Sequence, residues 1–179
     1  MKITPPHGRE TSDKIFLNCE YSDTTAGVRG DLVVFDLTDN RGAAGINQNT
    51  WGLRVIRHTG VGTVSGVDVL MSAGVLETDV EPTPAPTAFS GTSRGKMILV
   101  QCYGVHDQAA YGLNGILPGL AVITPDDSNA GKMLANTKAT LRADIAAGTY
   151  YPQAIGWNLE DSGADFSRKS MFVKTLGMS

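Results

Sequence analysis

The sequence predicts a mostly β protein, a small β-barrel or β-sandwich domain with an extended N-terminal arm and at most one or two short helices. Composition is the first reason, since 21 glycines and 8 prolines accompany a charged fraction of only 18%, a balance that favours turn-rich β structure. The second reason is that short apolar runs alternate with glycine- and proline-containing turns along the 179 residues, as in barrels and sandwiches. A chain of this length buries roughly 70% of its unfolded surface, so it needs no disulfide or metal to fold.

Residues 1–14, MKITPPHGRETSDK, are predicted to form the arm, because Pro5, Pro6 and Gly8 interrupt any periodic apolar pattern. The arm lacks the apolar segment of a secretory signal peptide, and no run in the chain reaches membrane-spanning length. Two interpretations remain open, a disordered tail and an arm that orders against a neighbouring subunit. In the second, the expected partner-binding residues are Ile3, Thr4, Pro5, Pro6 and His7.

Residues 15–179 are predicted to form one β-rich domain. Its strands are expected where β-branched and aromatic residues lie between turn signals: 15–21, 31–37, 51–56, 67–71, 97–102, 154–160 and 171–176, the last two as a hairpin. The apolar run 97–102 indicates a buried strand that ends in a turn at Gly104. One short helix is predicted over residues 136–147, with Leu141 and Ile145 four positions apart and Gly148 as its C-terminal cap.

A proline-rich segment within residues 80–90, VEPTPAPT at 80–87, is expected to be stiff and extended. Two interpretations are open here as well. The segment either divides the domain into two subdomains or forms a long surface loop, since proline is excluded from central strands. Neither half alone has a complete set of predicted strands, which favours the single domain.

Three neighbouring residues, Cys102, His106 and Asp107, have the types of a nucleophile, a base and an orienting acid. On a regular strand, however, residues four apart are separated by about 13 Å, which is beyond hydrogen-bond reach. The expectation is therefore a buried cysteine and a turn histidine, and no catalytic residue. His7, His58 and His106 are too dispersed for a zinc site. The sequence accordingly predicts no enzyme, no metal and no cofactor.

Other motifs have plain structural explanations. The glycine-rich stretches 60–66 and 91–96 miss the spacing of phosphate-binding loops and are predicted to be hairpin turns. Arg29-Gly30-Asp31 matches an adhesion tripeptide, but it directly precedes a strand, so a turn is expected. The acidic residues Glu160, Asp161 and Asp165 are expected to solvate a loop. Cys19 and Cys102 are predicted to be buried free thiols because each lies in an apolar context.

Net charge is −3 with both signs dispersed. Without a basic cluster to neutralise phosphates, nucleic acid is not an expected partner, and neither is a membrane.

A further pattern runs through the second half of the chain. An apolar strand leads into Val-Gln-Cys-Tyr-Gly-Val-His at 100–106, followed by a glycine turn at 112–115, Pro-Gly at 118–119, Gly-Lys at 131–132, and the closing segments 155–161 and 172–174. This pattern resembles the core and C-terminal hairpin of capsid decoration, or cement, proteins of tailed bacteriophages. The resemblance is weaker over residues 14–80.

The resemblance implies a structural virion protein on the outer capsid surface. Such a protein, commonly a homotrimer, binds the major capsid protein and stabilises the shell by bridging its subunits, so that weak contacts repeated by symmetry act together. Alternatives remain open: a receptor- or glycan-binding module that stacks sugars on Trp51, Tyr150 and Tyr151, a hydrolase using Cys102, or another virion component such as a head-fibre or tail protein.

Overall fold

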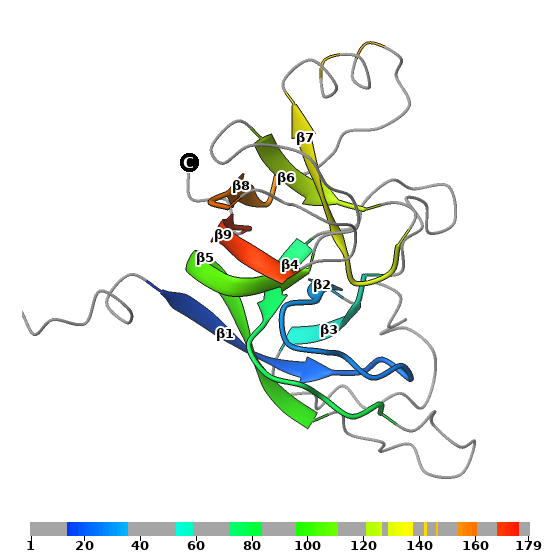
Figure 1. Cartoon of the computed structure of the whole chain (residues 1–179). Coiled ribbons are helices and arrows are strands. Elements are labelled where there is room, and N and C mark those ends of the chain that lie inside the picture. Colours follow the sequence, from blue (N-terminus) through cyan, green and yellow to red (C-terminus); the bar gives the residue numbers. More distant parts are fainter. Residues whose placement is uncertain are drawn as a thin grey trace, which may run out of the picture.

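The computed structural model describes residues 14–35, 53–58, 72–83, 96–110, 121–126, 129–137, 142, 146, 154–160 and 168–175. Nine strands within these ranges belong to one continuous sheet (Figure 1). They are β1 (Ile15–Tyr21), β2 (Leu32–Phe35), β3 (Leu53–Arg57), β4 (Ser72–Leu76), β5 (Lys96–Ala110), β6 (Ala121–Pro125), β7 (Met133–Thr137), β8 (Gly156–Asn158) and β9 (Arg168–Lys174). The mostly β fold that the composition predicts is confirmed.

The first five strands close into a barrel. Their order is β1–β3–β2–β4–β5, and β5 pairs back with β1, so that the last strand meets the first. The β1–β3 pair is parallel, whereas β2–β3, β2–β4, β4–β5 and β5–β1 are antiparallel. Of the two predicted architectures, barrel and sandwich, the barrel is the one that forms.

Strand β5 connects the barrel to the rest of the sheet. Its first half pairs with β1, and its second half pairs with β9, which is followed by β8, β6 and β7. Tyr103 marks the crossover, because it lies opposite Ile15 of β1 and also opposite Lys174 of β9. The predicted C-terminal hairpin is confirmed as the antiparallel β8–β9 pair, and its strand β9 pairs with β5.

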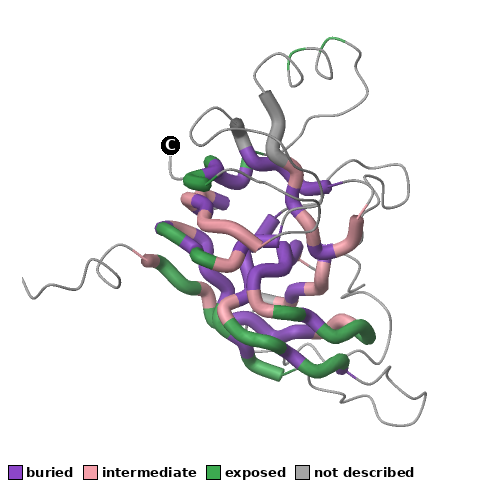
Figure 2. Tube along the Cα trace, viewed as in Figure 1, coloured by how far each residue is buried: buried purple, intermediate pink, exposed green. Residues whose placement is uncertain are grey.

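Two apolar clusters form the core. One fills the barrel and includes Tyr21, Val55, Leu76 and Val100. The other joins barrel residues to the later strands: Leu32, Val75, Ala109, Ile123, Met133, Ile155, Met171 and Val173, all fully buried. Because the second cluster draws on β2, β4 and β5 as well as on β6, β7, β9 and the residue before β8, it joins the barrel to the later strands. Figure 2 shows the buried residues gathered where these strands meet.

Several local predictions are wrong, among them the turn expected at His106, which is fully buried within strand β5 and lies opposite Met171 of β9. Strand β5 does not end in a turn at Gly104. It continues through that residue, which is buried, has a φ of 99° and lies opposite Val173 of β9. Glycine alone adopts this φ without strain, so the residue that suggested a turn lets a long strand pass between two pairing partners.

The predicted helix also begins too early. Residues 136 and 137 end strand β7, where Asn136 lies opposite Val122 of β6, because hairpin pairing overrides the local helical pattern. Of the remaining positions, Arg142 and Ala146 are helical and exposed. The other positions of that prediction lie outside the described residues, as does the predicted strand 67–71.

The arm and the domain boundary stay predictions, since residues 1–13 and 84–95 lie outside the described part of the chain. Of the proline-rich segment, residues 80–83 are described: Val80 pairs with Gly27, and Thr83 is buried.

Candidate functional site

The candidate catalytic residues do not contact one another. The thiol of Cys102 donates to the carbonyl of Ile15 (3.2 Å). Nε2 of the fully buried His106 lies 3.1 Å from the carbonyl oxygen of Leu76, while its Nδ1 accepts the Gln108 N–H (3.1 Å). Asp107 is on the opposite, exposed side of β5, where it pairs with Arg29 (2.8 Å). Each side chain therefore has a partner other than the one that catalysis would require.

Burial also keeps both thiols protonated. Cys19 and Cys102 are free and buried, as the sequence predicts. Burial is the main reason that the pKa of Cys19 is raised to about 11, and the nearby Cys102 raises it further. Burial likewise raises the pKa of Cys102. Because the thiolate is the nucleophilic form of cysteine, neither residue is prepared to attack a substrate at neutral pH.

The Arg29-Gly30-Asp31 tripeptide is a turn that leads into β2, as predicted. Its aspartate is not available to an adhesion receptor, because Asp31 is fully buried. One of its oxygens lies 3.0 Å from Nε of Arg57 in β3, and the other lies 3.3 Å from Nη2 of Arg168 in β9. Asp31 is thus the centre of an ionic cluster rather than a recognition residue.

A third cation completes the cluster around Asp31. Nζ of Lys132, in the turn between β6 and β7, lies 3.6 Å from its carboxylate. Burial is the main reason that the pKa of Lys132 is lowered, and Arg168 and Arg57 lower it further while Asp31 opposes them. Sequence reasoning missed this cluster because its members are far apart in the chain. It ties the barrel to both later hairpins.

His58 gives the fold a predicted sensitivity to acid. It is fully buried, and burial lowers its pKa from 6.5 to about 4 against an opposing effect of Asp126. The unfolded chain therefore binds a proton at a higher pH than the folded protein does. The free energy of unfolding should therefore be highest above pH 6.5 and should decrease as the pH drops toward 4. His58 accounts for at most about 3 kcal/mol of this decrease. Urea unfolding of wild type and His58→Gln at pH 7 and pH 4.5 measures it, and an equal loss in both proteins would contradict the assignment.

Apolar side chains cover part of the sheet's outer side. Along β5, Ile98, Val100 and Cys102 are buried whereas Met97, Leu99 and Val105 are 45–52% exposed, an alternation that Gln101 interrupts because it is buried as well. The sequence predicts a buried strand here; instead, only one of its two apolar faces is covered. Four more exposed apolar residues lie on β1, which pairs with β5, and on or just after β8, which β9 separates from β5: Ile15, Phe16, Trp157 and Leu159.

These residues join into one surface through the strand register. Trp157 of β8 lies opposite Phe172 of β9, and Phe172 lies opposite Val105 of β5. The Phe172 ring contacts Trp157 (centroids 5.9 Å apart) and meets Tyr103 edge to face (5.1 Å). We call this surface the outer apolar face: Ile15, Phe16, Met97, Leu99, Tyr103, Val105, Trp157, Leu159 and Phe172.

Several predicted site residues lie outside the described part of the chain. They are the arm residues Ile3, Thr4, Pro5, Pro6 and His7, the stacking aromatics Trp51, Tyr150 and Tyr151, the glycine-rich stretch 60–66, and Asp161 and Asp165. Of the three predicted loop acids, Glu160 is described, and it accepts hydrogen bonds from the backbone and hydroxyl of Ser170.

The described ranges hold no group of three His, Cys, Asp or Glu side chains placed to bind a metal ion. Within the same ranges, no helix combines the length and the hydropathy needed to cross a bilayer.

Comparison with known protein families found no match, and comparison with curated protein sequences found none either. Among solved structures, the chain is similar to one described as the crystal structure of the head fiber gp8.5 N base in bacteriophage phi29. The similarity covers 90% of this chain and 95% of that chain, with 10% identity and a TM-score of 0.47. A likeness at this level supports no conclusion about function.

Proposed function

We propose that this chain is a structural protein of a bacteriophage virion, which binds the outer surface of the capsid and stabilises the shell by bridging subunits of the major capsid protein. The outer apolar face is the observation that carries the proposal. Large apolar side chains that stay exposed in a contiguous group are typical of protein interaction sites. Much of this face lies on β5, β8 and β9, the strands whose sequence resembles phage decoration proteins.

A repeated, non-catalytic contact also fits the chemistry of the described residues. Cys102 and His106 are engaged in structural contacts, and the ionic cluster around Asp31 holds strands together. A homotrimer is part of the proposal, because three identical faces on one symmetric particle bind together more tightly than one. Sedimentation equilibrium of the purified protein tests the trimer, and a strict monomer would argue against it.

The capsid contact is tested with expanded capsids that lack this protein. Purified chain should co-sediment with them and should raise the temperature at which they release DNA. Cryo-electron microscopy of the loaded particle should then place it on the outer shell surface. Failure to co-sediment would overturn the proposal, and density on a tail or on a fibre instead of the shell would replace it with that assignment.

A charge placed on the outer apolar face should weaken capsid binding. Val105 is 45% exposed and pairs with the aromatic group of β9, so Val105→Lys inserts an ammonium into the proposed interface without entering the core. We expect a loss of roughly 10- to 100-fold in affinity, corresponding to about 1–3 kcal/mol. The measurement is a co-sedimentation titration of the variant against wild type.

Thr25→Lys is the matched control for that titration. Thr25 is also β-branched and exposed, but it lies on the loop after β1 and outside the outer apolar face. The same charge at this site should leave binding unchanged. Equal losses for the two variants would point to a general effect of charge and not to the face.

A further inference from the structure

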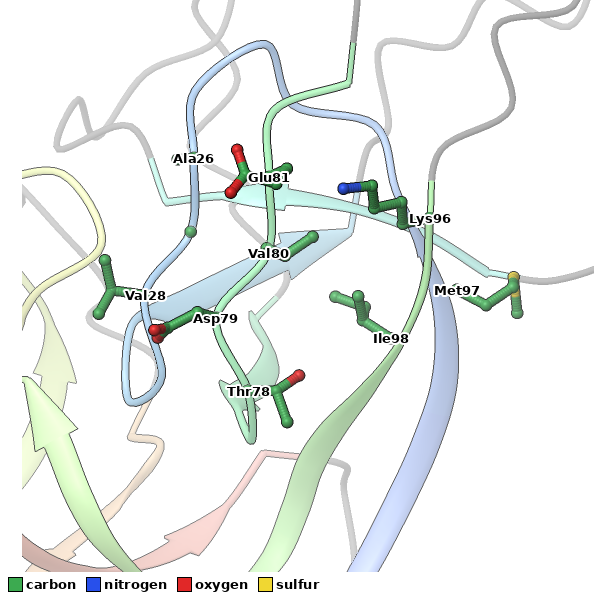
Figure 3. A pocket seen from close by; sticks show the side chains of 10 residues that line it. Ala26, Val28, Thr78, Asp79, Val80, Glu81, Lys96, Met97 and Ile98 are labelled. Atoms are coloured by element: carbon green, nitrogen blue, oxygen red, sulfur yellow. The ribbon is translucent and has the colours of Figure 1, made fainter.

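A groove opens at one end of the barrel, between residues 78–81 and the start of β5. Its volume is about 390 Å³. The lining combines apolar and charged side chains from three segments: Ala26, Gly27 and Val28; Thr78, Asp79, Val80 and Glu81; and Lys96, Met97 and Ile98. Figure 3 shows the two banks, with the chain of residues 78–81 on one side and the first residues of β5 on the other.

The groove forms because β4 and β5 diverge. Their paired residues are Val75 with Gln101 and Leu76 with Val100, followed by one more hydrogen bond from the Glu77 N–H to the Leu99 carbonyl (3.2 Å). Beyond that point the chain turns to Gly27, with which Val80 exchanges two backbone hydrogen bonds of 2.9 Å. The barrel therefore opens at this end, where no strand of the described part of the chain pairs with β5 on the β4 side.

This opening leaves a strand edge facing the groove. In an antiparallel pair, successive residues direct their backbone groups to opposite sides, so residues two apart face the same neighbour. The Leu99 carbonyl faces β4, and hence the N–H and C=O of Met97 face residues 78–81 across the groove. Among the described residues, no backbone hydrogen bond joins Met97 to that segment. Such an edge is a template for another strand.

The side chains around the edge indicate what that strand would carry. Val80 and Ile98 point toward each other from the two banks and form an apolar floor (Figure 3). Exposed Glu81 gives one bank a carboxylate, and Asp79 on the same bank is exposed but accepts the Arg29 backbone N–H (2.7 Å), whereas the other bank carries Lys96. An apolar side chain over the floor, next to a basic one at the acidic bank, would match this lining.

We propose that the groove binds an extended peptide segment of a partner protein, which adds to the free edge of β5 at Met97. Backbone hydrogen bonds would supply affinity, while the apolar floor and the acidic bank would select an apolar residue next to a basic one. The proposal is independent of the capsid assignment, because a strand from any partner protein with this chemistry fits the same edge.

The test uses ¹⁵N-labelled full-length protein and a short blocked peptide that alternates valine with threonine and carries one arginine. Binding should shift the amide signals of residues 78–81 and 96–98 and slow hydrogen exchange at the Met97 amide. The same peptide with N-methylated backbone amides should bind at least about tenfold more weakly, since it cannot donate to the edge. Absence of shifts at millimolar peptide, or shifts confined to other residues, would overturn the proposal.

Two variants test separately how the strand edge at Met97 and the acidic bank contribute to peptide binding. Met97→Pro removes the edge donor and should abolish the response, while unchanged peptide binding by a folded Met97→Pro variant would overturn the proposal. Glu81→Lys, at an exposed residue, should lower the affinity for the arginine-containing peptide about tenfold. This variant should instead prefer a peptide in which glutamate replaces the arginine. Equal affinity of Glu81→Lys for both peptides would count against the proposal. If the amide signals of residues 78–81 and 96–98 shift with protein concentration in the absence of peptide, the groove binds a second copy of this chain, and the proposal of a partner peptide is overturned.

Discussion

Asp31→Asn is expected to destabilise the protein by about 3 kcal/mol, toward the lower end of the range for breaking a buried ion pair. The substitution keeps the shape of the side chain but leaves Arg57, Lys132 and Arg168 without their shared anion. The cations are 17–27% exposed, so water compensates part of the loss, whereas the Asp31 side chain is only 1% exposed. Urea unfolding at pH 7, followed by circular dichroism, measures the change.

Asp107→Asn is the matched control for this experiment. The Asp107 carboxylate also pairs with an arginine, at 2.8 Å from Arg29, but its side chain is 58% exposed. Exposed pairs contribute less than about 1 kcal/mol because water and salt screen them. A similar loss of stability for both variants would show that the cluster around Asp31 does not hold the barrel to the later strands.

Local sequence patterns predicted most of the described strands, and they did so for a physical reason. β1, β2 and β3 are rich in β-branched, aromatic and other apolar residues between turn signals, and this preference acts within a few residues. Barrel closure was not predictable in the same way. It requires β5 to pair with β1 and β1 to pair in parallel with β3, and these contacts are set by the packing of the whole core.

The functional surfaces were harder to predict than the strands. The run 97–100 is apolar on both faces, so its sequence does not indicate which face the barrel covers and which stays exposed. The groove arises from the divergence of β4 and β5, which no single segment encodes. Asp31 has the sequence context of an ordinary turn, and only the folded chain brings Arg57 and Arg168 to it.

Gly30→Ala is expected to be the most damaging single substitution near this cluster, with a loss of at least about 4 kcal/mol or failure to fold. Gly30 has a φ of 91°, which L-residues with a side chain rarely adopt. A Cβ there would lie 1.6 Å from the carbonyl oxygen of Gln108 in β5. Relief would require moving the backbone of β5, and this would break the hydrogen bond from the Ala110 N–H to the Gly30 carbonyl (2.9 Å).

Gly27→Ala is the control for Gly30→Ala, because its added Cβ would meet side chains that can move and not a backbone carbonyl. A Cβ at Gly27 would approach methyl groups of Leu76 (2.6 Å) and Val80 (2.8 Å), which can shift at a typical overpacking cost of about 1–3 kcal/mol. Thermal and urea unfolding of the two variants should therefore rank Gly30→Ala well below Gly27→Ala in stability. If Gly30→Ala were the more stable of the two, the chain at residue 30 could not approach β5 this closely. In that case Asp31, the next residue, would lose the backbone anchor that holds its carboxylate among three cations.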